Sequence, residues 1–363
     1  MLIFLLIATC MIVAGHLGLY ASWVKFFSVN NTNIKWILRI GLGALSISFI
    51  IASLLTYWKE NAFVNALYSG VSVWLGMAWY LILAVAAAWI VILIGRWFGA
   101  AMPLAIVGSI FMAIGLAYSI HGIWNAQHPI IKRIVVTIPN LPQAWKGRTA
   151  VQLSDVHLGP VHREKFFQKV IDQVKPLNPD AVFVAGDLFD GSGRDLDKLA
   201  EPLNQLNPPL GMYYVTGNHE TYIGLDRAMA ALDAVRVTKL HDRAVIAAGL
   251  QIVGIDYPKI GEKKDFAAIM SHIDPDRPSI VLWHEPNHLD ELKQLGASLV
   301  LSGHTHVGQM WPFNFITQAM YHDNDYGLHS DGNFSVYTSS GVGTWGPPMR
   351  TGNRPEIVAI TFE

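Results

Sequence analysis

Four long apolar stretches near the N-terminus constrain the fold of this chain more than any other feature of its sequence. They cover residues 2–22, 36–57, 71–94 and 101–123, and a helix needs about 20 mainly apolar residues to cross a bilayer. Helices buried in a soluble domain would instead carry polar residues at helical spacing, and residues 84–94 contain none. The sequence therefore predicts four transmembrane helices.

The distribution of charge indicates two domains in two different solvents. Only 15% of the 363 residues are charged, which is low for a wholly soluble protein. We therefore predict a membrane domain at 1–128 and a water-exposed domain at 129–363. The charged residues before residue 130 are Lys25, Lys35, Arg39, Lys59, Glu60 and Arg96, and every aspartate lies beyond them.

Cysteine content and net charge exclude two further features. The single cysteine, Cys10, lies in the first apolar stretch, so no intrachain disulfide can form and the second domain must be stabilised by its own core. The formal net charge is −1, and the sequence contains no run of basic residues. Nothing therefore indicates nucleic-acid binding by a charged surface.

Basic residues in the short loops predict the orientation in the membrane. Lys25, Lys35 and Arg39 lie between the first two apolar stretches, and Arg96 lies between the last two. Because cytoplasmic loops carry an excess of Lys and Arg, these loops should be cytoplasmic. An even number of helices then places both termini and the second domain on the outer side. The margin is one charge, because basic residues also occur on that side, at Lys59, Lys132 and Arg133.

The apolar stretches offer little for a transport pathway. His16 and His121 lie within or at the end of these stretches. Ionisable residues that serve transport inside a membrane occur in pairs or chains, and the apolar stretches contain no paired acids or bases. We therefore interpret the helices as an anchor and both histidines as packing or interfacial residues. A transporter or sensor regulated by the second domain is the alternative.

The second domain begins near Pro129 and alternates strands with helices. Residues 130–138 are predicted as a strand, 141–147 as a turn and 163–174 as a helix. Such alternation is typical of an α/β architecture. Further short apolar strands are predicted at 149–153, 181–184, 212–215, 251–255, 280–283, 299–301 and 335–338.

Five of these strands end in polar residues that can bind metal or transfer protons. Ligands bind at the carboxyl ends of strands in such sheets, so we expect the five clusters to converge on one site. A glycine directly precedes three candidate ligands, where it allows a tight turn and close approach of the backbone. The clusters are Asp155 with His157, Gly186-Asp187 with Asp190, Gly217-Asn218-His219-Glu220, His284, and Gly303-His304-Thr305-His306.

Spacing within the clusters predicts how the side chains are oriented. In extended chain, residues two apart face the same way and neighbours point apart. We therefore expect Asn218 and His219 to diverge, one toward a metal and the other toward substrate. The pairs expected to face the same way are Asp155 with His157, and His304 with His306.

The residue types are those of a dinuclear metal site. Asp, His and Asn without thiolate suit borderline divalent ions such as manganese, iron, zinc or cobalt. Seven candidate ligands are too many for one tetrahedral zinc, and two ions sharing Asp187 fit the number. A water held between two such ions has a pKa low enough to act as a nucleophile near neutral pH. Two divalent ions less two carboxylates and a hydroxide leave about one positive charge, which matches a phosphoryl group.

The five clusters in this order resemble the calcineurin-like metallophosphoesterase superfamily, whose motifs are DxH, GDxxD, GNH with a following acid, a lone H, and GHxH. The resemblance covers about 150–363, and SGHTHVGQ at 302–309 and PPMRTGNRPE at 347–356 are similar to its membrane-attached bacterial branch. Val307 stands where that branch typically has glycine, at a position that is not a ligand. The resemblance implies a two-sheet α/β sandwich in a multi-pass protein of a bacterial plasma membrane. It also implies hydrolysis of a phosphomonoester, phosphodiester or pyrophosphate bond.

The same resemblance implies a role for each candidate residue. His219 would be the general acid that protonates the leaving oxygen. Asp190 and Glu220 would orient other site residues through hydrogen bonds, or would be ordinary surface carboxylates. The first metal would be bound by Asp155, His157, Asp187 and His306, and the second by Asp187, Asn218, His284 and His304.

Two groups of residues have open interpretations. Arg350 and Arg354 either bind a phosphate or acidic head group or pair with Glu356. An apolar cluster after the GHxH motif, with Trp345 and Pro347, either packs in a core or forms a rim against the bilayer that admits an amphipathic substrate. The cluster contains Met310, Trp311, Pro312, Phe313, Phe315 and Ile316.

The predicted tether favours a lipid-linked phosphate as the substrate, because the site would work beside a bilayer. A catalytically silent binding or scaffold module is the alternative from another functional class. Such a module would be expected to lose metal ligands, and this sequence retains all seven.

Overall fold

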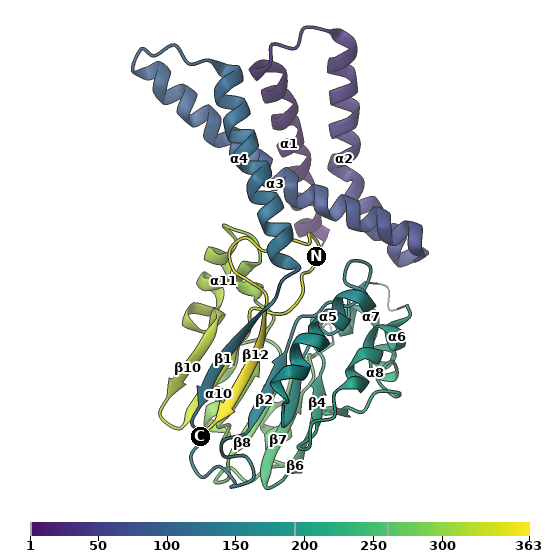
Figure 1. The fold of residues 1–363 in the computed structure, drawn as a ribbon, viewed down its shortest axis with the longest axis vertical. Coiled ribbons are helices and arrows are strands. Elements are labelled where there is room, and N and C mark those ends of the chain that lie inside the picture. Colours follow the sequence, from purple (N-terminus) through teal and green to yellow (C-terminus); the bar gives the residue numbers. More distant parts are fainter. Residues whose placement is uncertain (1, 192–193, 260) are drawn as a thin grey trace. The chain divides into compact units, whose positions relative to one another are not determined.

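The chain divides into two compact units, one of long helices and one of mixed α/β structure (Figure 1). The first comprises Met1–Trp124 with Gly346–Met349, and the second comprises Asn125–Trp345 with Arg350–Glu363. This computed structural model describes residues 2–191, 194–259 and 261–363.

Four helices in the described part of the first unit are long and apolar enough to cross a membrane. A helix suits such segments because it satisfies its backbone hydrogen bonds internally. The third begins at Ala62 rather than at the predicted residue 71, because the side chain of Asn61 caps it by accepting from the backbone N–H of Val64 at 3.0 Å. The bounds are α1 Leu2–Phe26, α2 Thr32–Trp58, α3 Ala62–Trp97 and α4 Leu104–Ala126.

The histidine within α1 has a packing role. His16 is buried, and the indole N–H of Trp74 donates to its Nε2 at 3.0 Å. Its Nδ1 lies 2.8 Å from the carbonyl oxygen of Ile12. Both ring nitrogens are therefore occupied by contacts within the helical unit, as the packing interpretation predicts.

The second unit is built on two mixed sheets. Among the described residues, the first has the strand order β1-β12-β2-β3-β4-β5. β2, β3, β4 and β5 run parallel, and β12 runs antiparallel to β2. The bounds are β1 Ile130–Val136, β12 Glu356–Phe362, β2 Thr149–Leu153, β3 Ala181–Ala185, β4 Met212–Val215 and β5 Thr238–Lys239.

The second sheet has the order β10-β11-β9-β8-β7-β6 over the residues that the structure describes. β7, β8, β9 and β11 run parallel, and the edge strands β6 and β10 are antiparallel to their neighbours. The central strands of each sheet therefore have their carboxyl ends at one edge. The bounds are β6 Arg243–Ala247, β7 Leu250–Ile255, β8 Ser279–Trp283, β9 Leu299–Ser302, β10 Gly327–Asp331 and β11 Phe334–Thr338.

Short helices connect the strands. The predicted helix at 163–174 is α5, which begins one residue later, after Arg163. The others are α6 Leu196–Ala200, α7 Asn218–Ile223, α8 Leu225–Ala230, α9 Phe266–Met270, α10 Leu289–Gln294 and α11 Asn314–Tyr321, and α5 itself is Glu164–Val174. Single 3-10 turns lie at Lys175–Leu177, Glu201–Gln205, His306–Gly308 and His322–Asp325.

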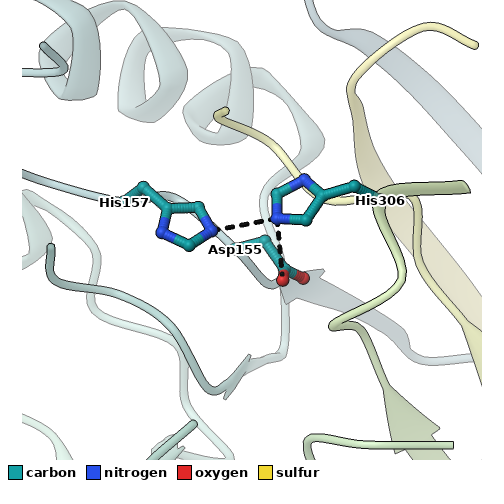
Figure 2. A group of neighbouring side chains, drawn as sticks. All are labelled: Asp155, His157 and His306. Carbon is teal, nitrogen blue, oxygen red and sulfur yellow. Dashed lines mark hydrogen bonds and ion pairs between the residues drawn. The ribbon is translucent and has the colours of Figure 1, made fainter. Parts of the chain in front are cut away.

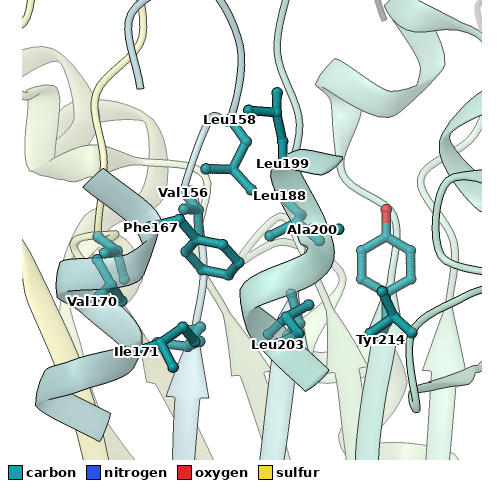
Figure 3. Close-up of a cluster of buried hydrophobic side chains, with 14 of the residues drawn as sticks. Val156, Leu158, Phe167, Val170, Ile171, Leu188, Leu199, Ala200, Leu203 and Tyr214 are labelled. Atoms are coloured by element: carbon teal, nitrogen blue, oxygen red, sulfur yellow. The ribbon is translucent and has the colours of Figure 1, made fainter. Parts of the chain in front are cut away.

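Helices cover the outer face of each sheet. Side chains alternate along a strand, so on β2 Val151 packs under the helices while Ala150 faces the second sheet. On α5, Phe167, Val170 and Ile171 lie at helical spacing and pack on the first sheet (Figure 3). Phe167 is fully buried, and its truncation to alanine would cost about 3–5 kcal/mol of stability. α9 and α10 cover the second sheet in the same way.

The predicted fold class is confirmed: long apolar helices precede an α/β unit of two mixed sheets. Four strands were not predicted, namely β5, β6, β10 and β12. The edge strand β10, GLHSD, is polar and only partly buried, so it lacks the continuous apolar run by which the buried strands were recognised. β6, RAVIA, and β12, EIVAITF, do contain apolar runs and were overlooked. β5 has two residues, too few for any pattern.

Candidate metal centre

All seven candidate ligands lie just beyond the carboxyl ends of central strands, either in loops or, for Asn218 and His306, at the first residue of a helix or 3-10 turn. These segments follow β2, β3 and β4 in the first sheet and β8 and β9 in the second, and the strands within each set are neighbours. Six of the ligands are buried, and His304 is partly exposed. In chain order they are Asp155, His157, Asp187, Asn218, His284, His304 and His306.

The first donor group consists of Asp155, His157 and His306 (Figure 2). Nε2 of His157 lies 2.9 Å from Nε2 of His306, which in turn lies 3.3 Å from Oδ1 of Asp155. Two imidazole nitrogens and a carboxylate oxygen that face one another in a buried place are the donor set of a borderline divalent metal. The residues fit a bound cation, because one positive ion would satisfy all three donors.

The second donor group consists of Asp187, His284 and His304. Oδ2 of Asp187 lies 3.1 Å from Nε2 of His284 and 3.9 Å from Nε2 of His157, a member of the first donor group. Asp187 therefore lies between the two groups, where a bridging ligand is expected. Nδ1 of His304 lies 2.8 Å from Oδ1 of Asn218, which brings the predicted amide ligand to the second group.

The backbone at the ligands is not extended, so the period-two argument does not apply there. Asp155 and His157 share a donor group as predicted, but His304 and His306, which were expected to face the same way, belong to different donor groups. Asn218 and His219 open helix α7 instead of continuing a strand. Left-handed conformations of non-glycine residues cost about 1–3 kcal/mol each and gather at functional sites. Five ligands have such a positive φ: Asp155 at 54°, His157 at 54°, Asp187 at 50°, His304 at 72° and His306 at 49°.

The three glycines that precede ligands are closely approached by other ligands. A Cβ at Gly217 would lie 2.2 Å from a carboxylate oxygen of Asp187. At Gly303 and Gly186 a Cβ would lie 2.2 Å and 2.5 Å from atoms of two further candidate ligands. Of the three, Gly186 alone has a positive φ, at 87°. All three positions therefore require glycine because a side chain would collide with another ligand. At Gly186 the positive φ is a second reason, because glycine adopts it without strain.

Burial and neighbouring charge separate the histidines by pKa. Burial lowers the pKa of His157 to about 3 and that of His304 to about 4, and it holds the pKa of His306 well below the usual value. These imidazoles are neutral at neutral pH and offer lone pairs to a metal. Burial would also lower the pKa of His284, but Asp187 raises it to about 10. A metal that binds there must displace a proton.

The predicted general acid, His219, reaches both donor groups. Donor atoms of His219, His157 and Asp187 lie within 4.8 Å of one another, and Nδ1 of His219 lies 2.9 Å from Oδ1 of Asp190. Burial alone would lower the pKa of His219, but Asp187 and Asp190 raise it to about 9. In the metal-free site the ring is therefore protonated at neutral pH, the state from which a general acid donates.

Glu220 orients the ligand loops and is not a surface carboxylate. It is fully buried and accepts from the backbone N–H groups of Asp187 at 3.1 Å, Phe189 at 2.9 Å and Gly217 at 2.7 Å. Burial raises the pKa of Glu220 to about 7. Its carboxyl group fixes the loop after β3 against the start of α7.

Three residues beside the second donor group were not predicted. The ring of Tyr257 stacks on His304 with centroids 6.4 Å apart, and Tyr321 contacts the same ring edge-on at 6.1 Å. The hydroxyl of Tyr321 donates to Oε1 of Glu285 at 2.9 Å. Glu285 could have been found, because it directly follows the ligand His284. The tyrosines lie after β7 and at the end of α11, and only folding brings them to the site.

Arg350 is placed neither to bind a phosphate of the substrate nor to pair with Glu356, the two roles considered from the sequence. Its side chain is fully buried, so it cannot meet a substrate. It donates to the carbonyl oxygens of Gly343 and His306, and burial lowers the pKa of Arg350 to about 10, so the guanidinium stays charged at neutral pH. Glu356 accepts instead from the hydroxyls of Tyr326 and Tyr337.

The apolar cluster after the GHxH motif divides between core and surface. Met310 is buried, with 5% of its surface exposed, and fits the core interpretation. On α11, Phe315 and Ile316 are 59% and 55% exposed, and Met320 is 63% exposed. The core interpretation is therefore wrong for this helix.

Comparison with known proteins supports this interpretation of the site. A family model described as calcineurin-like phosphoesterase matches residues 149–308, which include all seven candidate ligands. A transmembrane protein with metallophosphoesterase domain from Danio rerio is 32% identical over 274 residues, covering 69% of this chain and 62% of that protein. This chain therefore spans less than two thirds of the length of that relative.

Two bacterial relatives are covered more fully. An uncharacterized metallophosphoesterase of Campylobacter jejuni is 33% identical over 265 residues, which are 70% of this chain and 68% of that protein. Another, from Aquifex aeolicus, is 33% identical over 241 residues, which are 64% of this chain and 91% of that protein.

Proposed function

The chain belongs to the calcineurin-like metallophosphoesterase family, and from that premise we propose that it hydrolyses a phosphate ester with two divalent metal ions. The bond is a phosphomonoester, a phosphodiester or a pyrophosphate, and the ions are manganese, iron, zinc or cobalt. The observation that carries the proposal is the position of Asp187 between two buried donor groups. One ion in each group would share this carboxylate.

The bound ions would polarise the phosphoryl oxygens and lower the pKa of a water enough to make it a nucleophile. Asp155, His157 and His306 would hold one ion, and Asp187 would contact both. His219 would donate its proton to the leaving oxygen, and Asp190 keeps that proton in place. The second ion would be held by Asn218, His284 and His304.

We further propose a lipid-linked phosphate as the substrate. Helix α11 supports this, because Tyr321 at its end contacts His304 while Phe315, Ile316 and Met320 are exposed on its surface. Exposed apolar patches mark membrane or ligand contact. Residues 303–321 contain no Asp, Glu, Lys or Arg, which favours a lipid over a charged protein partner.

Metal analysis together with turnover of generic esters tests the hydrolase proposal. Purified full-length protein should bind two ions and cleave bis-p-nitrophenyl phosphate, p-nitrophenyl phosphate or pyrophosphate. Asp187→Asn should abolish metal-dependent turnover, because it weakens both ion sites at once. Protein that binds two ions and cleaves none of these compounds would indicate the silent binding module, and an unchanged rate in Asp187→Asn would sink the shared-ligand assignment.

A pair of substrates tests the lipid proposal. In Phe315→Ser with Ile316→Ser, turnover of a long-chain lipid phosphate in mixed micelles should fall by about tenfold or more, since a buried apolar side chain contributes about 1.5–3 kcal/mol. Turnover of the soluble nitrophenyl diester should stay the same. Ile246→Ser is the matched control, because Ile246 lies on edge strand β6 and is 67% exposed. Equal losses of turnover on both substrates would refute the proposal that these exposed residues of α11 bind a lipid substrate.

We propose that the catalytic unit lies on the outer side of a bacterial plasma membrane, as the basic loops predict. Ile246→Cys in a Cys10→Ser background should react with a membrane-impermeant maleimide in intact cells. Reaction only after lysis would place the unit in the cytoplasm.

A further inference from the structure

We propose that Glu285 is a specificity-determining residue that selects a phosphodiester over a phosphomonoester. Its carboxylate stands where the metal centre opens to solvent, and there it repels a second negative charge on the phosphate. The inference rests on the proposed function, because it narrows the three kinds of bond named there to one.

The metal centre is open beside its second donor group and closed around its first. In the first group the side chains of Asp155 and His157 are 0% exposed, and that of His306 is 3% exposed. In the second group His304 is partly exposed, and the side chain of the neighbouring His219 is 17% exposed. A phosphate therefore reaches the metals from the side of His304 and His219.

Two tyrosines fix the carboxylate of Glu285 at this opening. The hydroxyl of Tyr321 donates to Oε1 of Glu285 at 2.9 Å, and the Tyr321 ring contacts His304 edge-on at 6.1 Å. The ring of Tyr257 stacks on His304 with centroids 6.4 Å apart. Burial and the hydrogen-bonded carboxylate of Glu285 raise the pKa of Tyr257, so this phenol also keeps its proton and donates it. Both tyrosines therefore connect the carboxylate to a ligand of the second donor group.

The tyrosines orient the carboxylate without neutralising it. Phenol hydroxyls donate hydrogen bonds but carry no charge, and Glu285 itself is partly exposed toward an approaching substrate. Two further tyrosine contacts extend this surface to the general acid. Tyr222 is 59% exposed, and its ring lies 5.5 Å from that of His219. Its hydroxyl also raises the pKa of Tyr257, which places the two phenols near each other.

A negative charge at this place discriminates between substrates by their own charge. Near neutral pH a phosphomonoester carries close to two negative charges, because its second pKa is about 6, whereas a phosphodiester carries one. A fixed unit charge about 10 Å from a phosphate shifts the binding of each further unit charge by about tenfold at an effective dielectric of about 20. The carboxylate of Glu285 therefore disfavours the monoester by about that factor relative to the diester.

A matched pair of esters tests this selection in full-length protein at saturating Mn²⁺. p-Nitrophenyl phosphate and methyl p-nitrophenyl phosphate have the same leaving group and differ by one negative charge. In Glu285→Gln the ratio of kcat/KM for the diester to kcat/KM for the monoester should fall about tenfold. Glu285→Ala removes the same charge and should lower the ratio equally, whereas Glu285→Asp keeps the charge and should keep the ratio. A role in packing alone would lower turnover of both esters and leave the ratio unchanged.

Calorimetric binding of inorganic phosphate at pH 8 is a second measurement, and it needs no turnover. The phosphate dianion should bind the Mn²⁺-loaded Glu285→Gln protein tenfold or more tightly than it binds the wild type. Glu291→Gln is the matched control, because Glu291 lies on α10 and pairs with His288 at 3.1 Å. It should change neither quantity.

A wild-type ratio in both Glu285→Gln and Glu285→Ala overturns the proposal, and so does unchanged phosphate affinity in these variants. A wild type that binds phosphate and cleaves neither ester contradicts the proposed function separately.

Discussion

Gly217→Ala tests whether the carboxylate of Asp187 must lie where it does. The φ of Gly217 is −106°, which alanine adopts without strain. The added Cβ would lie 2.2 Å from Oδ1 and 2.7 Å from the backbone nitrogen of Asp187. Ordinary contact begins at 3.4 Å, so Oδ1 and the new methyl group must move apart by about 1.2 Å, the difference between the two distances.

This movement cannot be absorbed by a flexible side-chain end. Oδ1 of Asp187 accepts from the backbone N–H of His219 at 2.8 Å, and the backbone nitrogen of Asp187 donates to Glu220. The displacement therefore reaches the shared ligand and the general acid together. A misplacement of about 1 Å can lower turnover by about 10²-fold, whereas overpacking of this size typically costs about 1–3 kcal/mol of stability.

The assay is kcat for bis-p-nitrophenyl phosphate at saturating Mn²⁺, with thermal unfolding measured on the same samples. Gly217→Ala should stay folded and lose about 10²-fold in kcat. Gly352→Ala is the control, because its Cβ would meet no heavy atom nearer than 3.7 Å among the described residues. A folded Gly217→Ala protein with wild-type kcat would refute the reasoning that ties catalysis to this carboxylate.

Three further predictions concern pH and metal. In Asp190→Asn the pKa of His219 should fall, because a carboxylate that raises it is gone. The alkaline limb of the pH profile of kcat should then move to lower pH. A limb that does not move would contradict the role of His219 as the general acid. The pKa of His284 is about 10 before metal binds, so metal affinity should increase as pH rises toward that value. Calorimetry in two buffers with different heats of protonation should detect the released proton. Binding heats that do not depend on the buffer would argue against proton release from His284. Mn²⁺ at about 100 times its dissociation constant should stabilise the protein by about 2.7 kcal/mol per site, and a melting temperature that a chelator leaves unchanged would show that the donor groups are empty in solution.

The parts of the fold that could be predicted are those with a strong local pattern. The strands β2 and β4 are short apolar runs that end at polar clusters, and their predicted bounds match the structure. The edge strand β10 escaped prediction because one side of an edge strand is solvated and needs no continuous apolar run. The start of α3 was misplaced because its first turns are less apolar than its centre, although Asn61 caps them.

Within the site, candidate ligands could be named from the sequence, but their geometry could not be predicted. Residue type and motif order were enough to propose seven ligands and His219, and the structure brings six of the seven together as Asp155, His157 and His306 and as Asp187, His284 and His304. The assumption of extended chain failed at the ligands, because left-handed residues such as His304 and His306 turn each side chain separately. Tyr257 and Tyr321 carry no local signal of their place beside His304.

The apolar stretches and the order of the five motifs were determined by the sequence alone, because hydropathy and ligand chemistry are properties of neighbouring residues. The division of the ligands into two groups around Asp187 was already implied by the resemblance of the motifs. Only the tertiary structure decided the contacts of Arg350 with His306 and of Tyr257 and Tyr321 with His304. These contacts depend on hydrogen bonds and packing between segments far apart in the chain, which no local pattern encodes.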